Sequence, residues 1–223
     1  MIKVEKTDIW GFEHAIRGMR NPMNSWDRSD SYLHEFFSDN KAYGVGSIGK
    51  NDLGLMVKLY EAGPEHRKYL RQIFVSMDIT APLYWWKEFD TYKVGTVANS
   101  CSTMHKIQAK EFDIDDFSHE HLSDENLEFM DILIDRLNRE RKSFNLSKNK
   151  QNWWQLIQML PSSYNQKRTV TFNYENVISM IRQRKNHKLD EWHVFCDILK
   201  DLPYVEEITE SGESNYESSA EEV

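Results

Sequence analysis

The chain has 223 residues, of which 39% are apolar and 29% charged, and this composition is typical of a globular protein with a substantial core. The formal net charge is −8, but residues 205–223 hold seven Glu and no Lys or Arg, so residues 1–204 carry only −1. A nearly neutral folded part gives no basic field for a nucleic-acid duplex. We therefore expect no duplex partner.

The two ends of the chain predict a soluble protein with an unstructured tail. Residues 205–223 are acidic and Ser-rich, which predicts a disordered tail after a folded part over 1–204. No run approaches about 18 apolar residues, so we expect no membrane span. The N-terminus lacks the apolar core of a signal peptide, and two cysteines make no disulfide framework. These features predict a cytoplasmic protein with reduced thiols.

The apolar pattern predicts strands at both ends of a mostly helical chain. Residues 1–10 and 167–173 alternate as strands, whereas 65–80 begin as helix and become β-branched. Residues 23–50 are predicted as loop. Helical spacing predicts the remaining elements, which cover 11–20, 51–62, 83–93, 123–144, 152–160, 175–185 and 190–199. The order indicates one mixed α+β domain.

Two local patterns invite a functional interpretation. Gly44, Gly46 and Gly49 match GxGxxG, but a dinucleotide site needs a strand before the glycines and a helix opening on them. Neither is expected here, so a surface loop is predicted. Cys101 precedes His105 by four residues, which allows a thiol–imidazole nucleophile or a small buried thiol. The eight histidines show no zinc spacing, and no metal site is predicted.

The segment "APLYWWKEFDTYKVGTVANSCSTMH" (81–105) resembles the signature region of the flavin-dependent thymidylate synthase (ThyX) family. That region has an Ala-Pro start, then Trp-Arg-Gln-x-x-Arg-His-Arg and x-x-Ser-x-Asn-Glu-x-Ser-x-Arg-Tyr. Here Glu88 stands in place of Gln, and Thr91-Tyr92-Lys93 stand in place of Arg-His-Arg. With one inserted residue, the family's Ser, Asn and Ser fall near Thr96, Asn99 and Ser102.

Further segments follow in the family's order. "PEH" (64–66) is similar to its Glu-His pair, and "MLPSSYNQKRTVTFNYENVISMIRQR" (159–184) to its Leu-Pro, strand and Asn-x-Arg helix. "LDEWHVF" (189–195) is similar to its Ala-Gln-Trp segment after one insertion. The resemblance is clearest over 50–204. It implies a ThyX-like α+β domain over 1–204, with a central, mostly antiparallel sheet and flanking helices.

The resemblance implies a defined chemistry. The family methylates dUMP reductively with FAD, NADPH and methylenetetrahydrofolate, in homotetramers whose sites are built by several subunits. It thus implies a small-molecule nucleotide as partner and FAD as cofactor. Because the flavin supplies the hydride, such a protein mainly binds and orients its ligands. The phosphates need cations, preferably the fork of Arg.

The resemblance also assigns residues to the site. Arg184 matches the catalytic arginine at the pyrimidine, and Glu88 and Ser102 match substrate-binding positions. Cofactor contacts fall on Thr91, Tyr92, Lys93, Asn173 and Ser179. Three of these residues have structural alternatives: Arg184 suits a helix C-terminus, Ser102 a local cap, and Asn173 the N-cap of the following helix, which we favour.

Several charged residues of the family are missing from this chain. The Glu after Asn is Ser100, the Arg after Ser102 is Met104, and the phosphate-binding Arg four residues before Pro161 is Ile157. Each lost charge-assisted contact costs about 1.5–3 kcal/mol, so nucleotide binding needs replacements. Replacement cations are available at Lys93, Lys106, Lys167 and Arg168. Three hypotheses remain: a divergent synthase, an inactive homologue that binds a nucleotide or flavin, and a structural oligomer.

Overall fold

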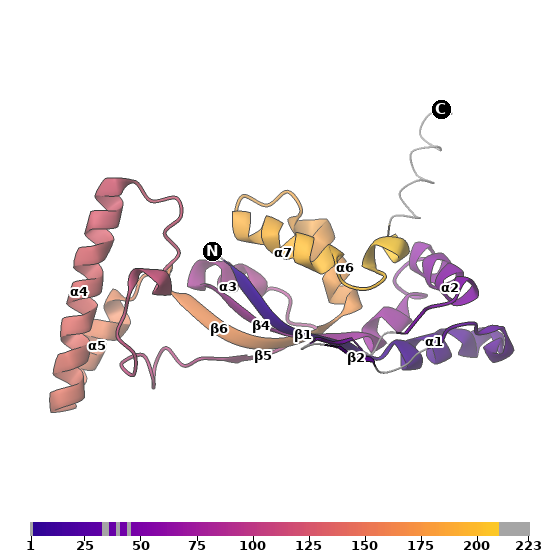
Figure 1. Ribbon diagram of the computed structural model, residues 1–223, viewed down its shortest axis with the longest axis horizontal. Helices are drawn as coiled ribbons and strands as arrows, with labels where there is room; N and C mark the ends of the chain where they lie inside the picture. Colours follow the sequence, from indigo (N-terminus) through magenta and orange to yellow (C-terminus); the bar gives the residue numbers. More distant parts are fainter. Residues whose placement is uncertain (1, 33–35, 39–40, 44–45, 210–223) are drawn as a thin grey trace. The chain divides into compact units, whose positions relative to one another are not determined.

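The computed structural model describes residues 2–32, 36–38, 41–43 and 46–209 (Figure 1). Six strands form one sheet in the order β2-β3-β1-β4-β6-β5. The strands are β1 (Lys3–Trp10), β2 (Phe36–Ser38), β3 (Lys41–Tyr43), β4 (Phe74–Pro82), β5 (Val97–Ser100) and β6 (Asn165–Asn173). The helices are α1 (Phe12–Arg20), α2 (Lys50–Glu61), α3 (Leu83–Phe89), α4 (Asp124–Ser147), α5 (Lys150–Met159), α6 (Tyr174–Arg184) and α7 (Asp190–Lys200).

Side-chain pairs on β4 and β6 give the relative direction of these strands. Thr169 Oγ1 donates to Asp78 Oδ1 at 2.6 Å, and Thr171 Oγ1 donates to Ser76 Oγ at 3.1 Å. The higher residue number on β6 pairs with the lower residue number on β4, so the two strands are antiparallel. β2 and β3 are also antiparallel, whereas β1 and β3 are parallel. The predicted α+β class with a mostly antiparallel sheet is confirmed.

Burial alternates along β4, as expected for a strand with one covered face. Val75, Met77, Ile79 and Ala81 are buried, and the residues between them are half-buried. The ambiguous stretch 65–80 thus divides into a 3₁₀ turn, Lys68–Gln72, followed by this strand.

The described residues form two compact units, each assembled from several stretches of the chain. The first comprises residues 2–4, 78–91 and 98–169. In it α4 packs beside α5 (Figure 1). The apolar core of this helix pair contains Ile107, Phe112, Phe117, Met130, Ile134, Leu137 and Leu156. On α3, Trp85, Trp86 and Phe89 are buried and contact one another. Much of the chain's aromatic content therefore serves as core.

The second unit comprises residues 5–77, 92–97 and 170–209. Helix α6 packs against α7, and α1 packs against α2 (Figure 1). Its largest fully buried side chains include Phe12, Tyr174, Trp192 and Phe195. Tyr174 donates a hydrogen bond to the Pro203 carbonyl at 2.8 Å. This unit contains most of the predicted site residues.

The segment around α2 differs from its prediction. Residues 23–50 were expected to be loop, but they contain β2, β3 and a 3₁₀ turn over Trp26–Arg28. Helix α2 begins at Lys50, one residue before its predicted start. The carboxylate of Asp30 supplies the cap, because it accepts from the backbone N–H groups of Asn51 and Asp52. A cap from twenty residues upstream leaves no signal in the local sequence.

The GxGxxG match therefore lies between a strand and a helix, contrary to the prediction. Gly44 lies outside the described residues. Gly49 directly precedes α2, and a Cβ at this position would lie 2.2 Å from the Asp30 carboxylate. Because Asp30 already occupies the first N–H groups of α2, this helix end does not offer them to a phosphate.

The C-terminal boundary lies later than predicted. Residues 205–209 form a helical turn in which Val205 and Ile208 are buried, so ordered chain continues past the expected end at 204. The remainder of the predicted disordered tail lies outside the described residues. Within the described part of the chain, no helix is both long and apolar enough to cross a membrane.

Candidate functional site

Arg184 is held over two aromatic rings of the second unit. It is the last residue of α6 and is half-buried. Its Nε donates to the Tyr92 hydroxyl at 2.9 Å, and its guanidinium carbon lies 4.9 Å from the centroid of Trp192 and 5.5 Å from that of Tyr92. Trp192 is fully buried, so the arginine is fixed by the core itself. Its position at the helix end also suits the helix dipole.

A hydrogen-bonded chain extends from Arg184 along α6. The Tyr92 hydroxyl donates to Gln183 Oε1 at 3.1 Å, and Gln183 Nε2 donates to Ser179 Oγ at 3.0 Å. Three predicted residues, Tyr92, Ser179 and Arg184, are therefore brought together. Gln183 was missed, although its spacing of four residues from Ser179 places both on one face of the helix.

Asn173 is the N-cap of α6, which is the structural role that we favoured for it from the sequence. Its side chain accepts from the backbone N–H of Asn176, which reciprocates in a capping box. Asn176 Nδ2 also donates to the Val94 carbonyl at 2.9 Å. Gly95 has a φ of 77°, and a Cβ there would lie 2.7 Å from Asn173 Nδ2. The segment after Tyr92 therefore lies directly against the start of α6 and needs a glycine to do so.

Two polar groups of this segment remain for a ligand. Lys93 is exposed, and the Oγ1 of Thr96 is buried with no hydrogen-bond partner among the described residues. A buried hydroxyl without a partner is uncommon, because desolvation costs about 1–3 kcal/mol when no hydrogen bond replaces water. Thr96 is thus a group that a bound ligand would satisfy.

In the first unit, the hydroxyls of the predicted site residues form hydrogen bonds within their own turns. Thr91 Oγ1 donates to the Glu88 carbonyl at 2.7 Å, which closes the end of α3, and the Glu88 side chain is half-buried. Ser102 Oγ accepts from the backbone N–H groups of Met104 and His105 at 3.2 and 2.9 Å. Ser102 thus has the capping role that was its alternative.

Two of the proposed replacement cations are paired with carboxylates. Lys167 Nζ lies 3.0 Å from Asp78, and Arg168 Nη1 donates to Asp90 at 2.8 Å. The Arg168 guanidinium carbon also lies 4.2 Å from the centroid of Trp86. These contacts were missed because the carboxylates lie far away in sequence. Lys106, the remaining candidate in this unit, is exposed.

The cysteines occupy opposite environments. Cys101 is exposed, so the expected buried thiol at this position is wrong. Across the described part of the chain, no hydrogen bond joins Cys101 to His105, and no cluster of three metal-ligating side chains occurs. Cys196 is the buried thiol. Burial raises its pKa to about 11, which keeps it protonated at neutral pH.

Comparison with solved structures identifies the fold. The chain superposes on ThyX from Helicobacter pylori with FAD and dUMP at a TM-score of 0.63 and 16% identity, over 93% of this chain and 96% of that one. The chain has the ThyX fold. A second structure of H. pylori ThyX with FAD and dUMP gives a TM-score of 0.62 and 17% identity, over 92% and 96%. No protein-family model and no curated protein matches the sequence.

Proposed function

We propose that this protein is a ThyX-like flavoprotein that binds dUMP or a related pyrimidine nucleotide and methylates it reductively. Its co-substrates would be NADPH and methylenetetrahydrofolate. The observation that carries the proposal is the near-complete overlap with ThyX structures that contain FAD and dUMP. The order of the resembling motifs along the sequence supports it independently.

The groups around α6 fit a phosphate-bearing aromatic ligand. Arg184 and Tyr92 offer a fixed cationic and aromatic surface, Lys93 offers an exposed ammonium, and Thr96 offers an unpaired hydroxyl. In the proposed site Lys93 and Thr96 hold phosphate oxygens, and Arg184 orients the base. FAD, when bound, supplies the hydride. The chain's own task is to position the ligands and to balance charge on the pyrimidine carbonyl.

A binding protein without turnover is the second candidate, and specific contacts favour it. The hydroxyls of Thr91 and Ser102 serve as caps, and Lys167 and Arg168 are paired with carboxylates. Few charged donors are then left for two phosphorylated ligands. Such a protein would retain one nucleotide or flavin and lack methyl transfer.

The assembly proposed is a homotetramer, as the family resemblance implies. Native mass spectrometry of the purified chain tests it directly. A tetramer supports sites shared between subunits, and a monomer under all conditions would contradict it.

Thermal unfolding with and without dUMP tests the function, with AMP as a matched phosphate control. A ligand that binds only the folded state raises the midpoint, by an amount equivalent to about 2.7 kcal/mol at a hundredfold excess over Kd. The proposal predicts a shift with dUMP and a smaller one with AMP. Formation of dTMP from dUMP with all cofactors then separates the enzyme from the binding protein. No shift with any nucleotide tested or with FAD would contradict both candidates.

A further inference from the structure

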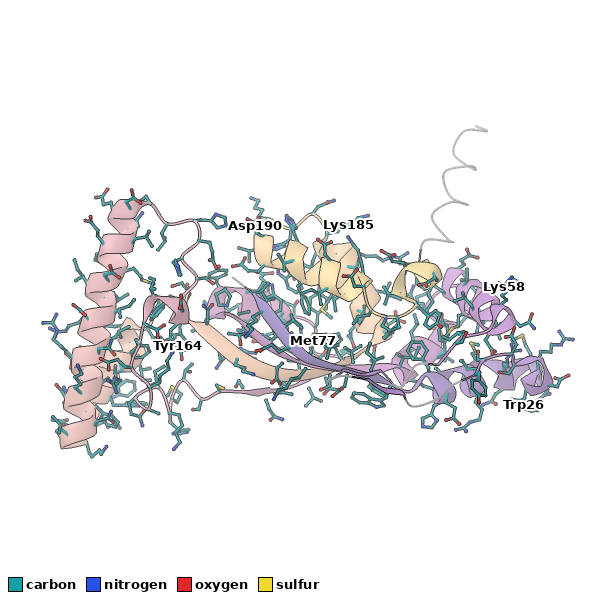
Figure 2. The ribbon with its side chains drawn as sticks, viewed as in Figure 1. Trp26, Lys58, Met77, Tyr164, Lys185 and Asp190 are labelled. Atoms are coloured by element: carbon teal, nitrogen blue, oxygen red, sulfur yellow. The ribbon has the colours of Figure 1, made fainter. Side chains whose placement is uncertain are left out.

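A polar cavity lies within the second unit, and neither Tyr92 nor Arg184 lines it. The end of helix α1, the turns that follow it, and α2 border an open cavity of about 720 Å³. Its lining includes three cationic side chains, Arg28, Lys50 and Lys58, and one carboxylate, Asp27. Figure 2 labels Lys58 on α2. In the part of the chain that the structure describes, none of these three cations forms an ion pair.

Arg20 also lines this cavity and has an unused donor. Its side chain is only 4% exposed. Nε donates to Asp52 at 2.6 Å, and Nη1 donates to the carbonyl and hydroxyl oxygens of Ser25 at 3.0 and 3.3 Å. Nη2 is buried and makes no hydrogen bond to any described residue. A buried guanidinium normally uses all its donors, so an unpartnered Nη2 indicates a missing acceptor.

Asp52 does not supply that acceptor. Its Oδ2 already accepts from the hydroxyls of Ser29 and Ser31 and from the backbone N–H groups of Asp30 and Ser31. Its Oδ1 accepts from Arg20 Nε. The Arg20–Asp52 pair is therefore electrically balanced, and the charge excess of the cavity comes from Arg28, Lys50 and Lys58.

Arg20 borders a smaller cavity of about 400 Å³ as well, but that cavity lacks the excess of charge. Besides Arg20, its lining carries one Glu and one Arg, Glu13 and Arg17, which lie 3.9 Å apart as an i, i+4 pair. The larger cavity therefore holds the uncompensated positive charge. Its attraction for anions does not come from the end of α2, because Asp30 already caps that helix.

We propose that the larger cavity binds a phosphate-bearing small molecule. One phosphate oxygen accepts from Arg20 Nη2 at the buried side, and Arg28, Lys50 and Lys58 neutralise the remaining charge. A single phosphate is much smaller than the available volume, so the ligand carries a second group or a second phosphate. Gly54 leaves the α2 side of the cavity open, because a Cβ there would meet nothing within 4 Å.

Isothermal titration of the full chain with inorganic pyrophosphate tests this site, at low salt and with sodium sulfate as a control anion. Saturable binding at one site is expected. Lys58→Gln should weaken it roughly fivefold, as one partly exposed charge contact is worth about 1 kcal/mol. The control is Lys142→Gln, which removes an exposed charge on α4 in the first unit, where Lys142 lies 3.4 Å from Glu111. Equal loss in both variants would overturn the proposal.

Gly54 provides a test that leaves the buried pair intact. Gly54→Glu places a carboxylate in the open space and should abolish pyrophosphate binding, whereas Gly54→Ala should preserve it. Both variants suit a helix interior better than glycine does, so misfolding is not expected. Arg20→Gln is a weaker test, because it leaves the buried Asp52 carboxylate without its cationic partner. Unchanged affinity in Gly54→Glu would contradict the assignment of this cavity.

The alternative occupant to be tested is the acidic segment 210–223 of the same chain, which carries five Glu. The Tyr204 hydroxyl accepts from the Ile48 backbone N–H at 3.0 Å, so the turn that precedes residues 205–209 lies beside the segment that enters α2. If the intact chain fails to bind pyrophosphate but a variant with Gln at the five Glu of 210–223 binds it, the tail is the occupant and the small-molecule proposal is wrong. This cavity shares no residue with the site around Arg184. Because dUMP also carries a phosphate, Gly54→Glu separates the two sites: it should abolish pyrophosphate binding and leave a dUMP shift from the Arg184 site unchanged.

Discussion

Arg184 Nε donates to the Tyr92 hydroxyl at 2.9 Å while the guanidinium lies over the fully buried ring of Trp192. The residue that the family resemblance assigns to the substrate is therefore also fixed to the core of its unit. Preorganisation of this kind suits a ligand-orienting group, because the side chain loses little further entropy on binding. It also means that stability and binding must be measured separately for this residue.

Replacement of Arg184 should reduce stability. Arg184→Ala removes a hydrogen bond and two cation–π contacts, and we expect the free energy of unfolding to fall by about 1–3 kcal/mol. Tyr92→Phe removes only the hydroxyl and should cost about 1 kcal/mol. Urea unfolding of both single variants and the double variant measures the coupling between them. A coupling near zero would show that the contact contributes nothing to the fold.

The caps at Asn173 and Ser102 should differ in their contribution. Asn173→Ala removes a buried capping box at the start of α6, so unfolding should be easier by about 1–2 kcal/mol. Ser102→Ala removes a cap on an exposed turn and should change stability by less than about 0.5 kcal/mol. Thermal unfolding of the two variants checks the ranking. Equal effects would mean that the α6 cap is replaced by water.

Asp52 should make the fold sensitive to acid. Burial alone would raise the pKa of this carboxyl, but hydrogen bonds from Ser31, Ser29 and Arg20 outweigh it and hold the pKa below its ordinary value of 3.8. A lowered pKa contributes stability that is complete above the unfolded value and is lost as the pH falls through the folded value. Wild type should therefore lose this contribution progressively below about pH 4.

Asp52→Asn is the matched variant for this pH dependence. It leaves Arg20 buried without its counter-charge, so at pH 7 it should be less stable by about 3–5 kcal/mol. The difference between wild type and variant should narrow below pH 4, where wild-type Asp52 begins to protonate. Denaturant unfolding at pH 7 and pH 3 checks this expectation. A difference that is constant with pH would exclude ionised Asp52 as the source of the stability.

The two thiols should react very differently with an alkylating reagent. Cys101 is exposed, whereas Cys196 is buried with a pKa raised to about 11 by that burial. At pH 8 the native protein should incorporate one equivalent of iodoacetamide, and the unfolded protein two. Peptide mapping by mass spectrometry assigns the modified residue. Labelling of native Cys196 at a rate similar to that of Cys101 would contradict its buried position.

The sequence predicted the fold class and most helices because these depend on local periodicity. The apolar spacing of α4 and the alternation of β6 are visible within single segments. Elements fixed by distant partners were not predictable in this way. The start of α2 depends on Asp30, and the order of β4 within the sheet depends on pairs such as Thr169 with Asp78.

The candidate site likewise combines features that the sequence predicted with features that depend on distant partners. The resemblance assigned Arg184 to the substrate and Tyr92 and Ser179 to the cofactor, and the structure brings all three into one hydrogen-bonded chain. The ion pairs of Lys167 and Arg168 could not be predicted, because Asp78 and Asp90 lie 89 and 78 residues away in the sequence. The unpaired Thr96 hydroxyl could not be predicted either, because its lack of a partner follows from how the folded chain buries it.

Flavin binding is the most direct test of the proposed function. The purified chain is titrated with FAD, separated from free flavin by gel filtration, and its visible absorbance is recorded. The ThyX-like assignment predicts a yellow protein with a perturbed flavin spectrum, and reduced retention of FAD in Lys93→Gln but not in Lys142→Gln. Absence of retained flavin at saturating FAD would contradict the assignment of this chain as a flavoprotein.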